Sequence, residues 1–157
     1  MYEIEKIISG GQTGADRAAL DFAIDNDIPY GGWIPKGRKT EEGPLSLKYH
    51  LQEMPTGDYS KRTEKNILDA EGTVIVSHGF LNGGSALTRE FAINYKKPWI
   101  HIDMKEMPLK EASNKFILWL EENKINVLDV AGPRASKDPA IYDATLRLLK
   151  VSLTKKT

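Results

Sequence analysis

The chain has 157 residues, of which 40% are hydrophobic and 28% charged, a balance typical of one folded domain with an apolar core. Its 22 basic and 22 acidic residues give a net charge of zero, which argues against a nucleic-acid-binding protein that relies on bulk positive charge. Because the chain contains no cysteine, disulfides, cysteine-ligated metals and thiol catalysis are excluded.

The first residues run directly into a strand-like segment and lack the apolar core of a signal peptide. No window approaches the roughly 18–20 apolar residues that are needed to span a bilayer. We therefore expect a cytoplasmic, soluble protein that binds neither a membrane nor a nucleic acid.

Short apolar runs alternate with longer amphipathic segments along the chain. Runs bounded by glycine or proline predict buried strands, and apolar residues spaced three and four apart predict helices. In chain order we predict a strand at 4–9, a helix at 14–26, a strand at 30–34, a long loop at 35–49, a short strand at 51–54, a helix at 59–71, a strand at 73–77, a glycine-containing loop at 78–84, a helix at 85–96, a strand at 98–103, a helix at 109–124, a strand at 126–130, a helix at 139–153 and a frayed tail at 154–157.

Three of these helices carry further signals. Thr13 is placed to cap the first helix, and Asp138 is placed to cap the last one. In the third helix, Leu87, Phe91 and Tyr95 recur every four residues and form one apolar face.

Strands that alternate with helices predict βαβ units and a mostly parallel sheet. The predicted fold class is α/β: a single Rossmann-like domain over 1–157, with a three-layer, doubly wound sheet and helices on both faces. In such sheets the ligand binds beyond the carboxyl ends of the strands, near the switch in strand order.

The loop at 9–16 is the first candidate site. Its paired glycines permit close approach and positive φ, and the following helix adds free N–H groups and the positive end of its dipole. It is neither a dinucleotide-binding fingerprint nor a P-loop, and the alternative to a phosphate site is a tight strand-to-helix turn. The candidate ligand contacts in this loop are Gly10, Gly11, Gln12, Thr13, Gly14 and Asp16, the last of which could equally serve as a cap.

The segment 82–88 repeats the strand, glycine and helix pattern, and we expect the strand before it to be adjacent to the strand before the first loop. It could bind a second phosphate or the other end of the same one, unless its glycines simply turn the chain. The candidate contacts here are Gly83, Gly84, Ser85 and Thr88.

Three arginines are candidate cations for an anionic ligand. Arg38 lies in the basic, glycine-containing loop 35–44, Arg62 lies near the start of a helix, and Arg134 follows the last strand. A solvated charged loop is an equally good interpretation of 35–44. The three histidines do not have the spacing of a metal motif, so no metal site is predicted.

The opening motif GGQTGADRAALD at 10–21 resembles that of the molybdenum cofactor carrier family, a YpsA-related branch of the SLOG, or lysine-decarboxylase-like, Rossmann superfamily. The similarity continues in order over nearly the whole chain, through 43–45, Tyr59, 62–66, 83–88, 97–98 and 130–134. The opening motif and the stretch from Ala131 to Arg134 are its most specific parts.

The resemblance implies the same lysine-decarboxylase-like fold and a homo-oligomer, a dimer or a tetramer, built on helix contacts. It also implies a ligand, the molybdenum cofactor, which is a pterin with a terminal phosphate and a dithiolene-bound molybdenum oxide. A carrier would store this ligand without turning it over, and molybdoenzymes would be its partners.

Two other functions remain open. Nucleoside 5′-monophosphate phosphoribohydrolases of the same superfamily use a Pro-Gly-Gly-x-Gly-Thr-x-x-Glu motif with an upstream arginine, and here Glu90 and Arg62 fall on those acidic and basic positions. The motif is not complete, because the chain departs from it at Asn82, Ala86 and Leu87. The third possibility is a sensor of a nucleotide derivative that signals through a partner protein. Of the three, the sequence favours a binding protein over a catalyst.

Overall fold

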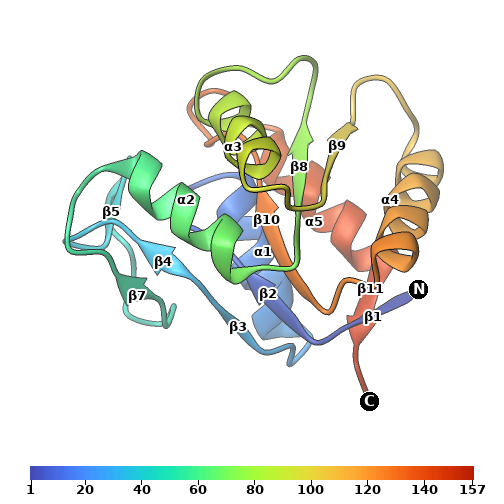
Figure 1. The fold of residues 1–157 in the computed structure, drawn as a ribbon, viewed down its shortest axis with the longest axis horizontal. Coiled ribbons are helices and arrows are strands. Elements are labelled where there is room, and N and C mark those ends of the chain that lie inside the picture. The colour runs from blue at the N-terminus through green and yellow to red at the C-terminus, as the bar shows by residue number, and fades with distance from the viewer.

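The structure is a computed structural model that describes all residues from 1 to 157 (Figure 1). Strands and helices alternate through most of the chain. In chain order the elements are β1 (Tyr2–Ile4), β2 (Lys6–Ile8), α1 (Ala15–Asp25), β3 (Tyr30–Gly31), β4 (Trp33–Ile34), β5 (Lys39–Thr40), β6 (Gly43–Pro44), β7 (Gln52–Glu53), α2 (Tyr59–Asp69), β8 (Gly72–Ser77), α3 (Gly83–Asn94), β9 (Trp99–Asp103), α4 (Leu109–Asn123), β10 (Val127–Ala131), α5 (Ile141–Ser152) and β11 (Leu153–Lys155).

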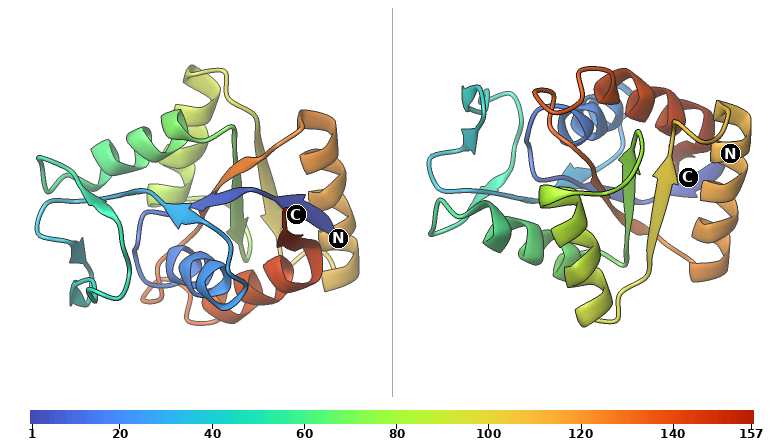
Figure 2. Two further views of the ribbon diagram at one scale, coloured as in Figure 1. Left: turned by 90° about the horizontal axis from the view of Figure 1, so that it is seen from below. Right: turned by 90° about the horizontal axis from the view of Figure 1, so that it is seen from above.

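The central sheet has five parallel strands in the order β3-β2-β10-β8-β9. Helices α1 and α5 cover one face of the sheet, with α4 beside α5, and α2 and α3 cover the other face (Figure 2). This arrangement confirms the predicted three-layer, doubly wound α/β fold with Rossmann-like topology.

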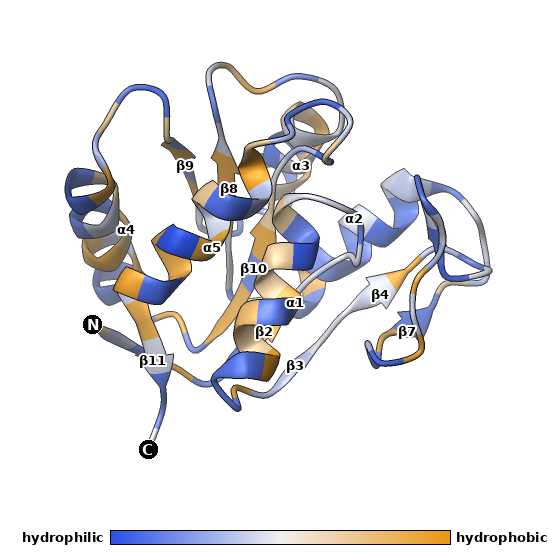
Figure 3. Cartoon of the chain, turned by 180° about the vertical axis from the view of Figure 1, so that it is seen from behind, coloured by the Kyte–Doolittle hydropathy of each residue, from blue (hydrophilic) through white to orange (hydrophobic).

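The main core lies between the sheet and the layer that contains α1, α4 and α5. Its largest side chains include Phe22 of α1 and Phe116 of α4, both essentially inaccessible to solvent. Alanines 15, 18, 19 and 23 of α1 are fully buried and allow this helix to pack close to the strands. Strands β8 and β10 are strongly hydrophobic, as expected for strands covered on both faces (Figure 3).

The predicted adjacency of the two strands that precede the glycine loops is wrong. Strand β10 lies between β2 and β8 and pairs with both of them. Its residues Leu128, Asp129 and Val130 are all buried, which suits the middle of a sheet. The loop that follows β10 is therefore placed between the two glycine loops.

Two predicted strands are each interrupted. The strand at 4–9 breaks at Glu5, because the N–H groups of Glu5 and Lys6 both donate to the carbonyl of Asn126. The strand at 30–34 breaks at Gly32, which has φ +132° and lies too close to the Ser9 carbonyl for a side chain. The loop at 35–49 contains the small hairpin β5–β6, and the predicted strand at 51–54 is present as β7.

Neither predicted helix cap is found. The N-cap of α1 is Gly14, because the Thr13 hydroxyl instead donates to Glu41 and accepts the Ala135 N–H. Helix α5 begins later than predicted, and Asp138 accepts the N–H of Ala140 in the turn that precedes it.

The apolar face predicted for α3 points largely to solvent. The buried residues of this helix are Ser85, Thr88 and Ala92, whereas Leu87 and Tyr95 are 37% and 43% exposed. None of the helices combines the length and the apolar run that crossing a bilayer requires.

The expectation of a frayed tail is also wrong. Leu153 packs into the main core, and the residues after it pair in parallel with β1 as the short strand β11. The N–H of Lys156 continues this pairing by donating to the Ile4 carbonyl at 3.1 Å.

Deleting residues 154–157 should therefore lower the free energy of unfolding by about 2 kcal/mol, because several backbone hydrogen bonds worth about 1 kcal/mol each are lost. Urea unfolding measures this change. Deleting Thr157 alone is the matched control and should have almost no effect. Equal stability of the two truncated chains would show that the pairing of β1 with β11 contributes nothing.

Candidate functional site

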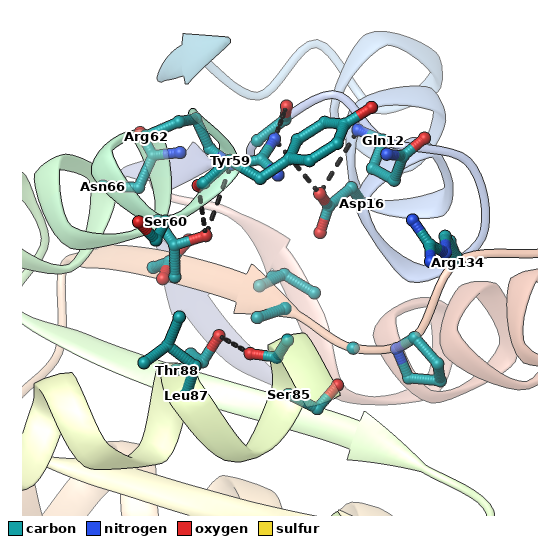
Figure 4. A pocket seen from close by; sticks show the side chains of 18 of the residues that line it. Gln12, Asp16, Tyr59, Ser60, Arg62, Asn66, Ser85, Leu87, Thr88 and Arg134 are labelled. Carbon is teal, nitrogen blue, oxygen red and sulfur yellow. Dashed lines mark hydrogen bonds and ion pairs between the residues drawn. The ribbon is translucent and has the colours of Figure 1, made fainter. Parts of the chain in front are cut away.

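A polar cavity of about 290 Å³ opens beyond the carboxyl ends of β2, β8 and β10 (Figure 4). Its walls come from the loop after β2, the first half of α2, the amino end of α3, and β10 with the loop that follows it. The structure brings together these predicted site residues in the lining: Gly10, Gln12, Asp16, Arg62, Gly84, Ser85, Thr88 and Arg134. That they contact a ligand stays a prediction.

The remaining predicted residues lie outside the lining. Gly11, Thr13 and Gly14 of the first loop, and Gly83 at the start of α3, are not among the residues that line it. Arg38 is held away from it, since its guanidinium donates to the carbonyls of Leu45, Ser46 and Tyr49.

The candidate hydrolase pair is not assembled. Arg62 lines the cavity, but Glu90 is exposed on α3 and is absent from the lining.

The first glycine loop is folded against the loop that follows β10. Gly14 has φ +79°, and a Cβ atom there would lie only 2.5 Å from the Pro133 carbonyl oxygen. That oxygen also accepts the N–H of Ala15 at 3.3 Å. The glycine therefore serves the close packing of two loops, in addition to any role toward a ligand.

Most N–H groups of the first loop already have acceptors within the chain. The N–H of Gly11 donates to Ser9 Oγ at 3.3 Å, that of Gln12 to Asp16 Oδ2 at 3.2 Å, and that of Thr13 to Gln12 Oε1 at 3.0 Å. The Asp16 carboxyl also lies in the first turn of α1, where it complements the helix dipole. This loop is thus a poorer anion site than its glycines predict.

The amino end of α3 differs in this respect. No acceptor in the chain takes the N–H groups of Gly83 and Gly84, and Asn82 makes no side-chain cap. Lys137 lines both this cavity and the one that adjoins it at Asn82 and Ser85, and Arg134 lines the first cavity. Free N–H groups and two cations make it the better place for a phosphate.

A second cavity of about 550 Å³ adjoins the first at this end. The two share Asn82, Ser85, Pro133 and Lys137 in their linings. His78 lines the second cavity, where its Nδ1 lies 2.7 Å from Asp138. No group of three or more histidine and acidic side chains is placed to hold a metal ion.

Two buried carboxyls and one buried guanidinium lie at the opposite end of the first cavity. Arg62 donates to the Gly10 carbonyl, and its Nη1 is 4.0 Å from Asp16 Oδ2. Asp129 Oδ2 accepts a hydrogen bond from Thr73 Oγ1 at 3.1 Å. Both aspartates line the cavity.

Burial raises the pKa values of both aspartates. The pKa of Asp16 rises to about 6, because burial outweighs the opposing charge of Arg62. The pKa of Asp129 rises to about 8, because burial is reinforced by the negative charge of Asp16. Asp129 therefore retains a proton at neutral pH.

Sequence reasoning missed Asp129 and Lys137 as cavity residues. Asp129 sits inside an apolar strand, so the pattern pointed only to a buried strand. A single acid in the middle of such a run was the available signal, because an unpaired buried acid is rare.

Glu41, in the turn between β5 and β6, ties three loops together behind the cavity. Its carboxylate accepts hydrogen bonds from the Thr13 hydroxyl and from the hydroxyl and N–H of Ser136, and it lies 3.6 Å from Arg134 Nε. Its own N–H donates to Gln12 Oε1 at 2.9 Å. Burial opposes ionisation of Glu41, but the hydrogen bonds from Ser136 and Thr13 outweigh it and lower the pKa.

Replacing Glu41 by Gln should lower the free energy of unfolding by about 1–3 kcal/mol, because the hydroxyl and N–H donors lose a charged acceptor. Urea unfolding is the measurement, and Glu42→Gln at the neighbouring exposed position is the control, expected within about 0.5 kcal/mol of wild type. A Glu41→Gln protein as stable as the control would contradict the proposed role of this carboxylate.

The raised pKa of Asp129 predicts how stability depends on pH. The native protein holds a proton that the unfolded chain releases near pH 4, so this contribution is complete below about pH 4 and is lost as the pH rises through about 8. Asp129→Asn should flatten the fall in the free energy of unfolding over this range. Exposed Asp143→Asn is the control and should keep the wild-type curve. Parallel curves for wild type and Asp129→Asn would rule out the raised pKa.

Comparison with known proteins identifies the family to which this chain belongs. Residues 7–153 match the model of the "Circularly permutated YpsA SLOG family". A solved structure named "Putative molybdenum carrier protein", from Syntrophus aciditrophicus SB, is 62% identical, with a TM-score of 0.93 over 94% of this chain and 94% of that chain. The comparison with curated proteins finds no match.

These findings confirm the resemblance to YpsA-related SLOG proteins and molybdenum carriers that the motifs indicated. Because the family match spans nearly the whole chain and the solved relative shares its fold, this protein belongs to the circularly permutated YpsA branch of the SLOG family.

Proposed function

We propose that this protein binds and carries a phosphate-bearing small molecule, the molybdenum cofactor, in the cavity beyond β2, β8 and β10. The observation that carries the proposal is the amino end of α3, where the free N–H groups of Gly83 and Gly84 lie beside Lys137, in a cavity that Arg134 also lines. Such a group of donors and cations suits a terminal phosphate. The name of the 62% identical relative supports the choice of a molybdenum-containing ligand.

The space around this phosphate site fits a ligand larger than a phosphate. The adjoining second cavity begins at the same residues, so a ligand held by its phosphate can extend to either side. Phosphate capture would use Ser85 and Thr88 as further polar contacts, and the buried end of the cavity would hold a ring system.

The position of Glu90 supports a protein that binds its ligand without transforming it. This carboxylate is the acid that a hydrolase mechanism would require, and it lies outside the cavity lining. A carrier needs only to bind, shield and release its cargo, in the cytoplasm, for delivery to molybdoenzymes. Exposed apolar side chains at the end of α3 and directly after it, among them Ile93 and Tyr95, support assembly into a homo-oligomer.

Titration calorimetry with purified molybdenum cofactor tests the proposal. We expect a saturable heat in wild type and binding weakened about 10- to 100-fold in Arg134→Ala, because a charge-assisted contact to the phosphate is lost. Arg147→Ala, at an exposed position of α5 outside the cavity, removes the same charge and should bind like wild type.

Two results would overturn the proposal. One is absence of heat with the cofactor while nucleotides bind tightly. The other is release of free base from nucleoside monophosphates by the wild-type protein, which would make it a hydrolase.

A further inference from the structure

The cavity has two ends with opposite chemistry. The end at α3, which adjoins the second cavity, presents free N–H groups and Lys137, whereas the buried end, here called the floor, presents the carboxyls of Asp16 and Asp129 beside Arg62. An anion is favoured at the first end, whereas at the second the positive charge of Arg62 is already offset by Asp16. A ligand that fills the cavity should therefore carry its phosphate at one end and hydrogen-bond donors at the other.

The two floor carboxyls are buried and incompletely paired. Asp16 and Asp129 are 9% and 4% exposed. Asp16 uses Oδ2 to accept the Gln12 N–H, and Asp129 uses Oδ2 to accept the Thr73 hydroxyl, while Oδ1 of each has no hydrogen-bond partner in the chain. Neither Oδ1 atom is fully enclosed by the protein, and both side chains line the cavity, where a ligand can reach these oxygens.

We propose, on the basis of the proposed function, that Asp129 and Asp16 form a subsite that recognises the adjacent ring N–H and amino group of a 2-amino-4-oxopyrimidine ring. A pterin and a guanine both present this pair of parallel donors. At neutral pH the ionised carboxylate of Asp16 accepts one of these donors, and Asp129, which keeps its proton, accepts the other through its carbonyl oxygen.

The rest of the floor suits a flat, neutral ring better than an alkylammonium. Tyr59 lines the cavity beside Arg62, whose guanidinium carbon lies 5.4 Å from the centre of the Tyr59 ring, and this ring offers apolar surface to a flat ligand (Figure 4). Arg62 already supplies the positive charge beside Asp16, so the uncommitted oxygens need donors more than a second cation.

Two matched ligand pairs test this subsite by calorimetry. GMP and IMP differ only in the 2-amino group, and a phosphorylated pterin differs from the phosphorylated lumazine in the same position. We expect the amino member of at least one pair to bind about tenfold or more tightly, because a site built to bond a donor rejects the analogue that lacks it. The pair that discriminates identifies the ring system, guanine or pterin.

Asp16→Asn should bring the affinity ratio of the discriminating pair close to one at neutral pH, because the amide replaces an acceptor oxygen of the ionised carboxylate by a donor. Asp129→Ala should reduce the same ratio, because it removes the acceptor oxygen, and exposed Asp143→Asn should leave the ratio unchanged. The ratio is insensitive to a general loss of affinity, and the wild-type ratios stand as a test even if Asp16→Asn does not fold.

Each outcome decides between the two proposals. Equal binding within both pairs, or tighter binding of AMP than of GMP, would overturn the carboxyl subsite and leave the phosphate-binding carrier intact. Failure of all these ligands and of the molybdenum cofactor to bind would instead overturn the proposed function itself.

Discussion

The pairing of β10 with both β2 and β8 is the constraint on which the rest of the site depends. It places the loop after β10 between the two glycine loops and sets Asp129 into the cavity floor. It also brings Pro133 against Gly14, so that the first loop packs onto its neighbour. With β10 at the edge of the sheet, these loops would not surround a common cavity.

Within this frame, local hydrogen bonding decides which glycine loop can take an anion. The first loop satisfies its N–H groups internally and holds the Asp16 carboxyl at the start of α1. The second leaves two N–H groups without acceptors beside Lys137. Two loops with the same sequence signature therefore differ in function: the first presents a carboxyl group, and the second presents free N–H donors. As a result, the two ends of the cavity favour different chemical groups of a ligand.

Much of the fold could be predicted from the spacing of apolar residues and the positions of glycine and proline, because buried strands and amphipathic helices have recognisable local sequence patterns. The order of strands could not, since the position of β10 depends on long-range pairing that leaves no local signal. The same limit applies to the site. The glycines and arginines of the sequence predicted most of the residues that line the cavity. The sequence could not predict that the N–H groups of the first loop have acceptors within the loop. It also could not predict that Arg38 donates to carbonyls of its own loop, because both features depend on tertiary contacts.

The parallel pairing of β1 with β11 has a mechanical consequence. The chain enters at the start of β1 and leaves at the end of β11, and both termini lie away from the cavity (Figure 1). Tension applied between the two ends would load the hydrogen bonds of this pair in shear, all at once, instead of opening them one by one. The first resistance to stretching would come from this small two-stranded clamp, before any force reaches the central sheet.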